Sequence, residues 1–251
     1  MADKIASLGN AKVQSFIAEQ KMYFTATSAL GKNSRINVSP KGYSMDCFRI
    51  EGEKVFLLDL SGSGIETIAH VKDNGRITLM FISFDEKPGI LRMYGKAKIH
   101  EKFANWFNSE TADTSKMNPK FIKLRNKHFA KSNLRELASC RSVIEIDIDL
   151  ILGSCGFAVP RMKFVGERTK LKDGHAKKKL AVFRKHWQGW NERSLDNLPG
   201  LSFRYKNPIV AATDFVRKHG RSLLLIATSM LAGSYIRSQF SGSSSGTCNI
   251  G

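Results

Sequence analysis

Hydrophobic and polar residues alternate in short runs along the N-terminal part of the chain, which predicts a domain built mainly of β-strands. The runs are rich in aromatic and β-branched residues, and glycine, proline or asparagine separates them, as in strands joined by tight turns. The predicted strands are Met22–Thr27, Arg35–Ser39, Asp46–Ile50, Lys54–Leu60, Arg76–Phe84, Ile90–His100 and, after a longer interval, Ser142–Ile151. Their order and short connections indicate an antiparallel meander that forms a small barrel.

Helical spacing of apolar residues interrupts this strand pattern. One helix is predicted at Ala11–Gln20 and a second at Ile65–Asp73, directly after the small-residue bend Ser61–Gly64. Ser63 and Glu66 have the spacing of a capping box, and the second helix ends at an Asn-Gly pair that suits a left-handed helix end. Further helical stretches are predicted around Phe103–Phe107, at Pro119–Ala130, and from Pro160 onward, where the chain is basic.

The C-terminal part contains one apolar run, Leu223–Ile236, with Arg221 before it and Arg237 after it. As a helix the run spans roughly 21 Å, which is shorter than the ~30 Å hydrocarbon core of a bilayer. Two interpretations stay open: a weak tail anchor whose flanking arginines reach the headgroups, or a buried or interfacial helix of a soluble protein. Residues 241–251 are rich in serine and glycine, and we expect them to be disordered.

Composition and charge narrow the class of protein. The chain has 251 residues, 42% of them hydrophobic, which suits one folded domain with appendages. Residues 1–110 contain 15 basic and 12 acidic side chains and residues 111–251 contain 25 and 10, so the net charge of +18 lies mainly in the C-terminal part. A basic surface attracts anionic lipids, phosphorylated ligands or nucleic acids, or it only keeps a protein soluble. No nucleic-acid-binding motif accompanies the charge, so a nucleic-acid partner is not expected.

Single residues give little indication of catalysis or metal binding. The four cysteines include no Cys-x-x-Cys pair and the N-terminus lacks the apolar stretch of a secretory signal. We therefore expect a cytoplasmic protein without a metal site, with membrane association through residues 222–236 as the open alternative. Asp46 and Asp59 have no sequence partner for acid–base chemistry, and the catalytic residues stay unknown. Other reactive or stacking side chains are interpreted as structural: His70 as a packing histidine, Cys155 as a buried cysteine, and Trp187 and Trp190 as core or interface aromatics.

Four motifs resemble the pyridoxamine 5′-phosphate oxidase family, in particular its fungal and other eukaryotic members. They are Ile36–Gly42, Asp59–His70 continuing to Asn74–Thr78, Gly153–Pro160 with Arg168-Thr169 beyond, and Asn191–Leu201. The resemblance covers about four-fifths of the chain. It implies a six-stranded antiparallel split β-barrel, a homodimer, and FMN at the subunit interface.

The resemblance also implies a cofactor site. Its residues are Asn37, Val38, Ser39, Lys41, Ser61, Gly62, Ser63, Gly64, Thr67 and Arg76. The free amides of the bend and a nearby hydroxyl suit a phosphate, to which Lys41 or Arg76 adds positive charge. The true oxidases of the family have an Arg-Lys pair where this chain has Ile65-Glu66, and their substrate-binding arginine and histidine motif finds no match. Oxidation of vitamin B6 is therefore not expected.

These observations lead to a division of the chain and to two hypotheses. We expect residues 1–157 to form the FMN-binding split barrel, residues 158–206 a basic helical extension, and residues 207–240 an apolar helix that is the candidate tail anchor. The leading hypothesis is an FMN-binding protein, a flavin-dependent oxidoreductase of unknown substrate. The alternative is a non-catalytic split-barrel binding module, tethered through its C-terminus to an anionic membrane surface.

Overall fold

The computed structural model describes residues 3–5, 7–103 and 117–202. The chain divides into two compact units, residues 1–203 and 204–251, and the described residues all belong to the first. Most of the predicted helix around Phe103–Phe107, the apolar run Leu223–Ile236 and the tail 241–251 lie outside the described residues. In the described part of the chain, no helix combines the length and the apolar character needed to cross a bilayer.

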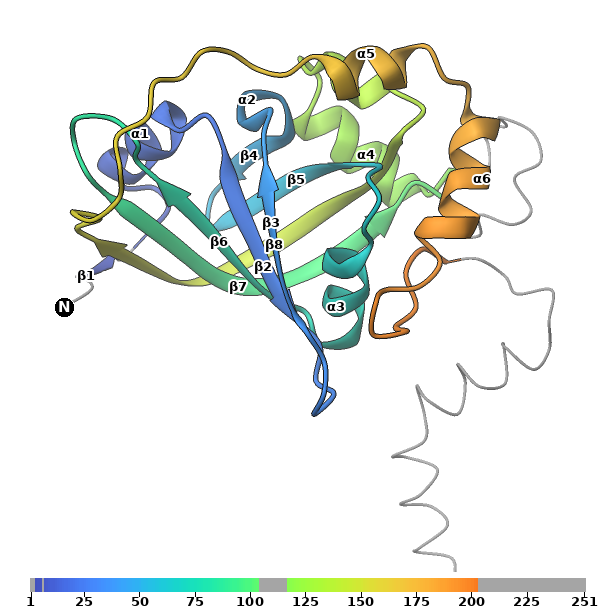
Figure 1. Cartoon of the computed structure of the whole chain (residues 1–251), viewed down its shortest axis with the longest axis horizontal. Coiled ribbons are helices and arrows are strands. Elements are labelled where there is room, and N and C mark those ends of the chain that lie inside the picture. The colour runs from blue at the N-terminus through green and yellow to red at the C-terminus, as the bar shows by residue number, and fades with distance from the viewer. Residues whose placement is uncertain (1–2, 6, 104–116, 203–251) are drawn as a thin grey trace, which may run out of the picture. The chain divides into compact units, whose positions relative to one another are not determined.

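Among the described residues, eight antiparallel strands form one sheet (Figure 1). The strands are β1 (Asp3–Ile5), β2 (Tyr23–Ser28), β3 (Ile36–Lys41), β4 (Phe48–Glu51), β5 (Lys54–Leu60), β6 (Arg76–Ile82), β7 (Ile90–Glu101) and β8 (Cys140–Ser154). Their order is β3-β2-β6-β7-β8-β5-β4, and β1 pairs with the last part of β8. Within the described residues β3 and β4 end this order without pairing to each other, so the barrel is open. The predicted mainly β, antiparallel split barrel is confirmed, with eight strands where the resemblance implies six.

The barrel is filled by side chains at alternating strand positions. Tyr23, Leu79, Phe81 and Met93 are among the buried residues of this core. In contrast, β5 and the first half of β8 are buried on both faces. Their outer faces are covered by α2 (Ser44–Cys47), α4 (Pro119–His128) and the 3₁₀ turn η2 (Asn133–Glu136). This double burial explains why the β5 sequence is a nearly continuous apolar run.

The two helices predicted in the barrel region are present as α1 (Ala11–Glu19) and α3 (Glu66–Asn74). Helix α3 ends at Gly75 in the left-handed conformation, with φ of 76°, as predicted. The predicted capping box is wrong: the first cap position is Ile65, and no side chain caps the helix. The Glu66 carboxylate turns instead toward the segment 191–202, where it accepts a hydrogen bond from the Leu195 amide at 3.4 Å.

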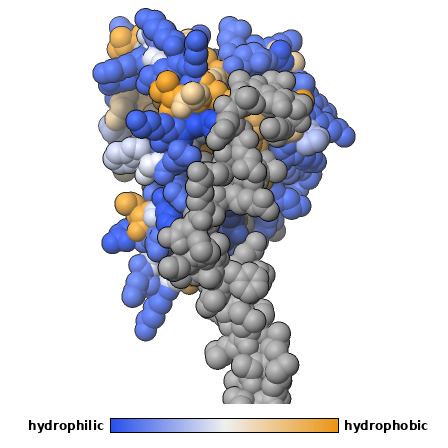
Figure 2. Space-filling view, turned by 90° about the vertical axis from the view of Figure 1, so that its right-hand side faces the viewer, coloured by the Kyte–Doolittle hydropathy of each residue, from blue (hydrophilic) through white to orange (hydrophobic). Residues whose placement is uncertain are grey.

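The basic region after the barrel is only partly helical. Residues 160–169 contain no helix, and two helices follow, α5 (Lys170–Ala176) and α6 (Leu180–Trp190). Helix α6 buries Phe183 and Trp187 in one cluster with Ile65 and Ile68, beside α3. The face of the molecule on the α6 side is mostly hydrophilic where it is coloured in Figure 2. Helix α6 is thus an amphipathic helix that docks on the barrel through one apolar side.

Candidate functional site

The bend Ser61–Gly64 is held from behind by α6 and the residue that follows it. The Ser61 hydroxyl accepts a hydrogen bond from the Trp187 indole, which is fully buried. The Gly62 carbonyl contacts His186 Nε2 at 3.1 Å and accepts a hydrogen bond from the Asn191 amide at 3.2 Å. A peptide carbonyl and the next N–H point in opposite directions. These contacts therefore turn the Ser63 N–H away from the donors that hold the Gly62 carbonyl.

A buried ion pair fixes the other end of the bend. Arg141, at the start of β8, donates from Nε to Asp59 Oδ2 at 2.6 Å, and both residues are buried. Both terminal nitrogens of Arg141 also donate to the Gly64 carbonyl at 3.2 Å, and one of them donates to Asn191 at 2.6 Å. One guanidinium thus links β5, β8, the bend and the end of α6. Sequence reasoning missed Arg141. The sequence does contain a usable signal for this ion pair, because an acidic residue lies at the end of one buried strand and a basic residue at the start of another.

Polar side chains of β3 face α3 and form a hydrogen-bonded chain. The Asn37 amide donates to Thr67 at 3.3 Å and to Thr27 at 3.4 Å, and Ser39 donates to Asn37 at 3.2 Å. Three of the predicted site residues, Asn37, Ser39 and Thr67, are thus brought together. Val38 points the other way and is 58% exposed.

Lys41 lines a cavity of about 220 Å³ together with Ser61, Gly62 and Thr67. Among the described residues, its ammonium group has neither a hydrogen bond nor an ion pair. Burial lowers the pKa of Lys41; the charge of Asp59 opposes this effect and that of Arg141 adds to it. A half-buried cation that has no partner in the described part of the chain, next to a hydroxyl and a glycine, is a candidate site for an anion.

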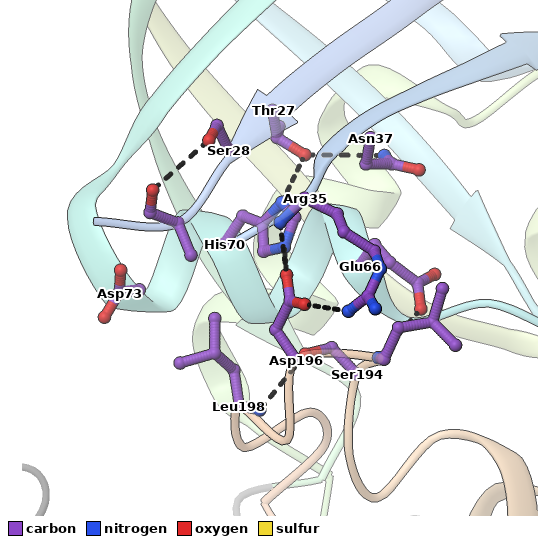
Figure 3. Close-up of polar contacts among 12 residues, drawn as sticks. Thr27, Ser28, Arg35, Asn37, Glu66, His70, Asp73, Ser194, Asp196 and Leu198 are labelled. Atoms are coloured by element: carbon purple, nitrogen blue, oxygen red, sulfur yellow. Dashed lines mark hydrogen bonds and ion pairs between the residues drawn. The ribbon is translucent and has the colours of Figure 1, made fainter. Parts of the chain in front are cut away.

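A second cavity, of about 600 Å³, is lined by Asn37 and includes Val38, Ser63 and Gly64 in its lining. His70 of α3 also lines this cavity, and Figure 3 shows its side chain between Thr27 and Asp196. The Nδ1 atom of His70 contacts the Thr27 hydroxyl at 3.1 Å. The sequence interpretation of His70 as a packing histidine fits its 1% exposure, but its Nε2 atom has no hydrogen-bond partner in the part of the chain that the structure describes.

The structure supports some of the remaining sequence interpretations and contradicts others. Arg76 lies in a separate groove of about 470 Å³ and donates to Asn74, so it is not brought together with Lys41. Cys155 is exposed, so its interpretation as a buried cysteine is wrong. It lies just beyond the paired part of β8, where Gly156 turns the chain with φ of 65°. Of the two tryptophans, Trp187 is a core residue, whereas Trp190 is 64% exposed at the larger cavity.

Comparisons with known proteins agree on one family. The family described as "Pyridoxamine 5′-phosphate oxidase" matches residues 10–155. The Pyridoxamine 5′-phosphate oxidase family protein ustO of Aspergillus flavus is 33% identical over 192 residues, which are 71% of this chain and 70% of that protein.

Solved structures match less closely. The heme storage protein HutZ of Vibrio cholerae is 16% identical, with 59% of this chain and 96% of that chain covered and a TM-score of 0.35. An FMN-binding protein of Syntrophomonas wolfei is 12% identical, with coverage of 55% and 81% and a TM-score of 0.36. TM-scores this low support no conclusion about ligands. The family match, in contrast, spans more than half of the chain and is sufficient to show the family. The chain belongs to the pyridoxamine 5′-phosphate oxidase family.

Proposed function

We propose that this protein binds FMN, with the phosphate held in the Lys41 cavity. The observation that carries the proposal is the Lys41 ammonium, which has no partner among the described residues and lies in one cavity with Thr67 and the bend at Gly62. Membership of the family supports it, because the motifs that carry the resemblance imply an FMN site in this region.

The residues present fit a phosphate. A phosphate is bound by cations, hydroxyls and backbone amides that approach it closely. Lys41 supplies the cation and Thr67 the hydroxyl, and a side-chain carbon added at Gly62 would meet nothing within 4 Å, so the backbone is accessible there. An anion next to Lys41 would also stabilise the charged ammonium that burial disfavours.

The polar edge of the flavin ring finds donors and acceptors on β3. This strand is the last in the sheet order, so its outer N–H and C=O groups have no strand partner within the described residues. Asn37 and Ser39 add side-chain donors on the face toward α3. When bound, a flavin supplies electron and hydride transfer, and the chain's own residues bind it, orient it and limit access of water.

We extend the proposal to a flavin-dependent oxidoreductase that works as a homodimer. Outward-facing apolar side chains of β6 and β7, including Met80, Ile82 and Tyr94, are only half-buried in the single chain. Covering such a face with a second copy removes apolar surface from water. A monomeric mass in sedimentation equilibrium would contradict the dimer.

One observation favours the alternative of a cofactor-free binding module. A side-chain carbon added at Gly64 would lie 2.4 Å from Glu66 Oε2, so a carboxylate occupies the space at this end of the bend. A negative charge there repels a phosphate placed at Gly64. Glu66 does not line the Lys41 cavity, and the Asp59 carboxylate that does line it is paired with Arg141. For this reason we prefer the FMN proposal.

Comparing FMN with riboflavin isolates the contribution of the phosphate. We expect FMN to bind at least about tenfold more tightly than riboflavin, and Lys41→Met to remove most of this difference, because hydrogen bonds to charged groups contribute about 1.5–3 kcal/mol. Titration of flavin fluorescence measures both affinities.

Arg76→Met is the matched control, since it removes the other candidate cation from a separate groove. The ratio of the two affinities should stay that of the wild type. Equal binding of FMN and riboflavin by the wild type would contradict phosphate recognition, and no binding of either would favour the cofactor-free module.

A further inference from the structure

Residues 157–172, which we call the strap, lead from the end of β8 into the first turn of α5 and run along the upper margin of the molecule in Figure 1. Before α5 begins, these described residues form neither a helix nor a strand. Every residue from Pro160 to Asp173 is exposed. A segment whose side chains stay in water contributes little to the core of its own domain. The strap is therefore a candidate surface for contact with another molecule.

The strap exposes large apolar side chains. Phe157 and Val165 are 82% and 94% exposed, and Met162 and Phe164 are at least half exposed. A single exposed apolar residue is ordinary in a folded protein, but four of them within nine consecutive residues form a local concentration. Such concentrations mark surfaces that a protein partner or a membrane covers.

Two hydrogen bonds hold the strap along the barrel. The Met162 N–H donates to the Phe84 carbonyl at 2.9 Å, and the Tyr43 hydroxyl donates to the Arg168 carbonyl. Both contacts use backbone atoms of the strap, so its side chains are not needed to hold it in place. A binding surface that is already fixed loses less conformational entropy on binding than a flexible segment does.

Basic residues are interleaved with the exposed apolar side chains. The strap contains one acidic residue, Glu167, and five basic residues, which are Arg161, Lys163, Arg168, Lys170 and Lys172. Lys21 adds a further cation, with its Nζ atom 5.9 Å from the centre of the Phe164 ring. Arg161 pairs with Glu86, but both side chains are more than two-thirds exposed, and such pairs contribute little to stability. Cations beside exposed apolar side chains suit an anionic bilayer, where the cations meet the headgroups and the apolar side chains enter below them.

Charge distinguishes a membrane from the other occupants of such a surface. A symmetric contact between two copies brings the same surface of each copy together, and two straps with a net charge of +4 each would repel one another. A nucleic acid would satisfy the cations, but its bases stack on aromatic rings and gain little from Met162 and Val165. An anionic bilayer satisfies both the cations and the apolar side chains.

We propose that the strap is a membrane-contact surface that binds bilayers containing anionic phospholipids. Lys163 and Arg168 bind the headgroups, while Phe164 and Val165 enter the boundary between headgroups and acyl chains. The proposal rests neither on the FMN site nor on the apolar run Leu223–Ile236, which lies outside the described residues.

Co-sedimentation of the full chain with lipid vesicles tests the proposal. A strap variant carries Lys163→Gln and Val165→Ser. We expect its affinity for vesicles of phosphatidylcholine with phosphatidylserine to be at least about tenfold lower than that of the wild type, because it loses one cation at the headgroups and one buried apolar side chain. The wild type should bind vesicles of phosphatidylcholine alone at least about tenfold more weakly than the anionic vesicles.

The matched control carries Leu30→Ser and Lys32→Gln in the β2–β3 connection, at the opposite end of the sheet in Figure 1. It also replaces one exposed apolar and one exposed basic side chain, so it loses the same charge, and its affinity for the anionic vesicles should equal that of the wild type. The proposal is overturned if the wild type does not bind these vesicles, or if the strap variant binds them as tightly as the control.

Two other outcomes would assign the strap to a different occupant and would also overturn the proposal. A lower mass of the strap variant in sedimentation equilibrium, with the mass of the control unchanged, would make a second copy of the chain the occupant. Loss of binding to single-stranded RNA in the strap variant, with its vesicle binding unchanged, would make the strap a nucleic-acid-binding surface.

Discussion

Replacing Arg141 by methionine is expected to lower the free energy of unfolding by about 3–5 kcal/mol, because it leaves the buried Asp59 carboxylate without its partner. The same change removes both hydrogen bonds to the Gly64 carbonyl and the bond to Asn191. The bend then loses the support that sets the direction of its peptide groups. Urea denaturation followed by circular dichroism measures the stability, and FMN titration should show weaker binding.

The double variant Arg141→Met with Asp59→Leu separates the two effects. Replacing both charges by apolar side chains removes the unpaired carboxylate, so we expect most of the stability to return while FMN binding stays weak. Lys127→Met is the control for an exposed pair, since Lys127 and Glu51 are both about half exposed. It should change stability by no more than about 1 kcal/mol. An Arg141 variant as stable as this control would contradict the role given to the buried pair.

Trp187→Ala should have an effect of similar size, a loss of about 3–5 kcal/mol, because it empties a fully buried position where α6 meets α3. It also removes the hydrogen bond to the Ser61 hydroxyl. Trp187→Phe keeps most of the packing and loses the hydrogen bond, so a smaller loss of about 1–2 kcal/mol is expected. Thermal and urea denaturation measure both variants.

Trp190→Ala is the matched change on the same helix, at a residue that is 64% exposed. Its stability should stay within about 0.5 kcal/mol of the wild type. If Trp187→Ala were no more destabilising than Trp190→Ala, α6 would not be an integral part of the domain, and its contacts with the bend could not position the site.

The barrel could be predicted from the sequence because its strands are bounded by local signals. Gly42, Gly52 and Gly75 mark turns or helix ends. The sequence interpretation of Arg76–Phe84 as a strand buried on both faces is wrong, because only alternate residues of β6 are buried. The capping box failed because a contact distant in sequence, between Glu66 and Leu195, competes with the local one. The unhelical stretch at residues 160–169 was missed because a basic composition alone does not distinguish a helix from an extended segment.

The residue types of the site could be predicted from the sequence, but which of these residues lie together could not. The small-residue bend and the polar positions of β3 were found from the motifs, and Asn37 and Thr67 do meet. The division into two cavities follows from side-chain packing, and so does the isolation of Arg76. Asp196 and Arg35 are separated by 161 residues, and no local pattern pairs an acid with a base at that distance.

A crystal structure of the full chain with FMN would show directly where the phosphate binds. We expect a phosphate oxygen within hydrogen-bonding distance of Lys41 Nζ, with the Thr67 hydroxyl as a second donor. A phosphate bound at Arg76, or FMN absent from a crystal grown with an excess of it, would contradict the proposed Lys41 site.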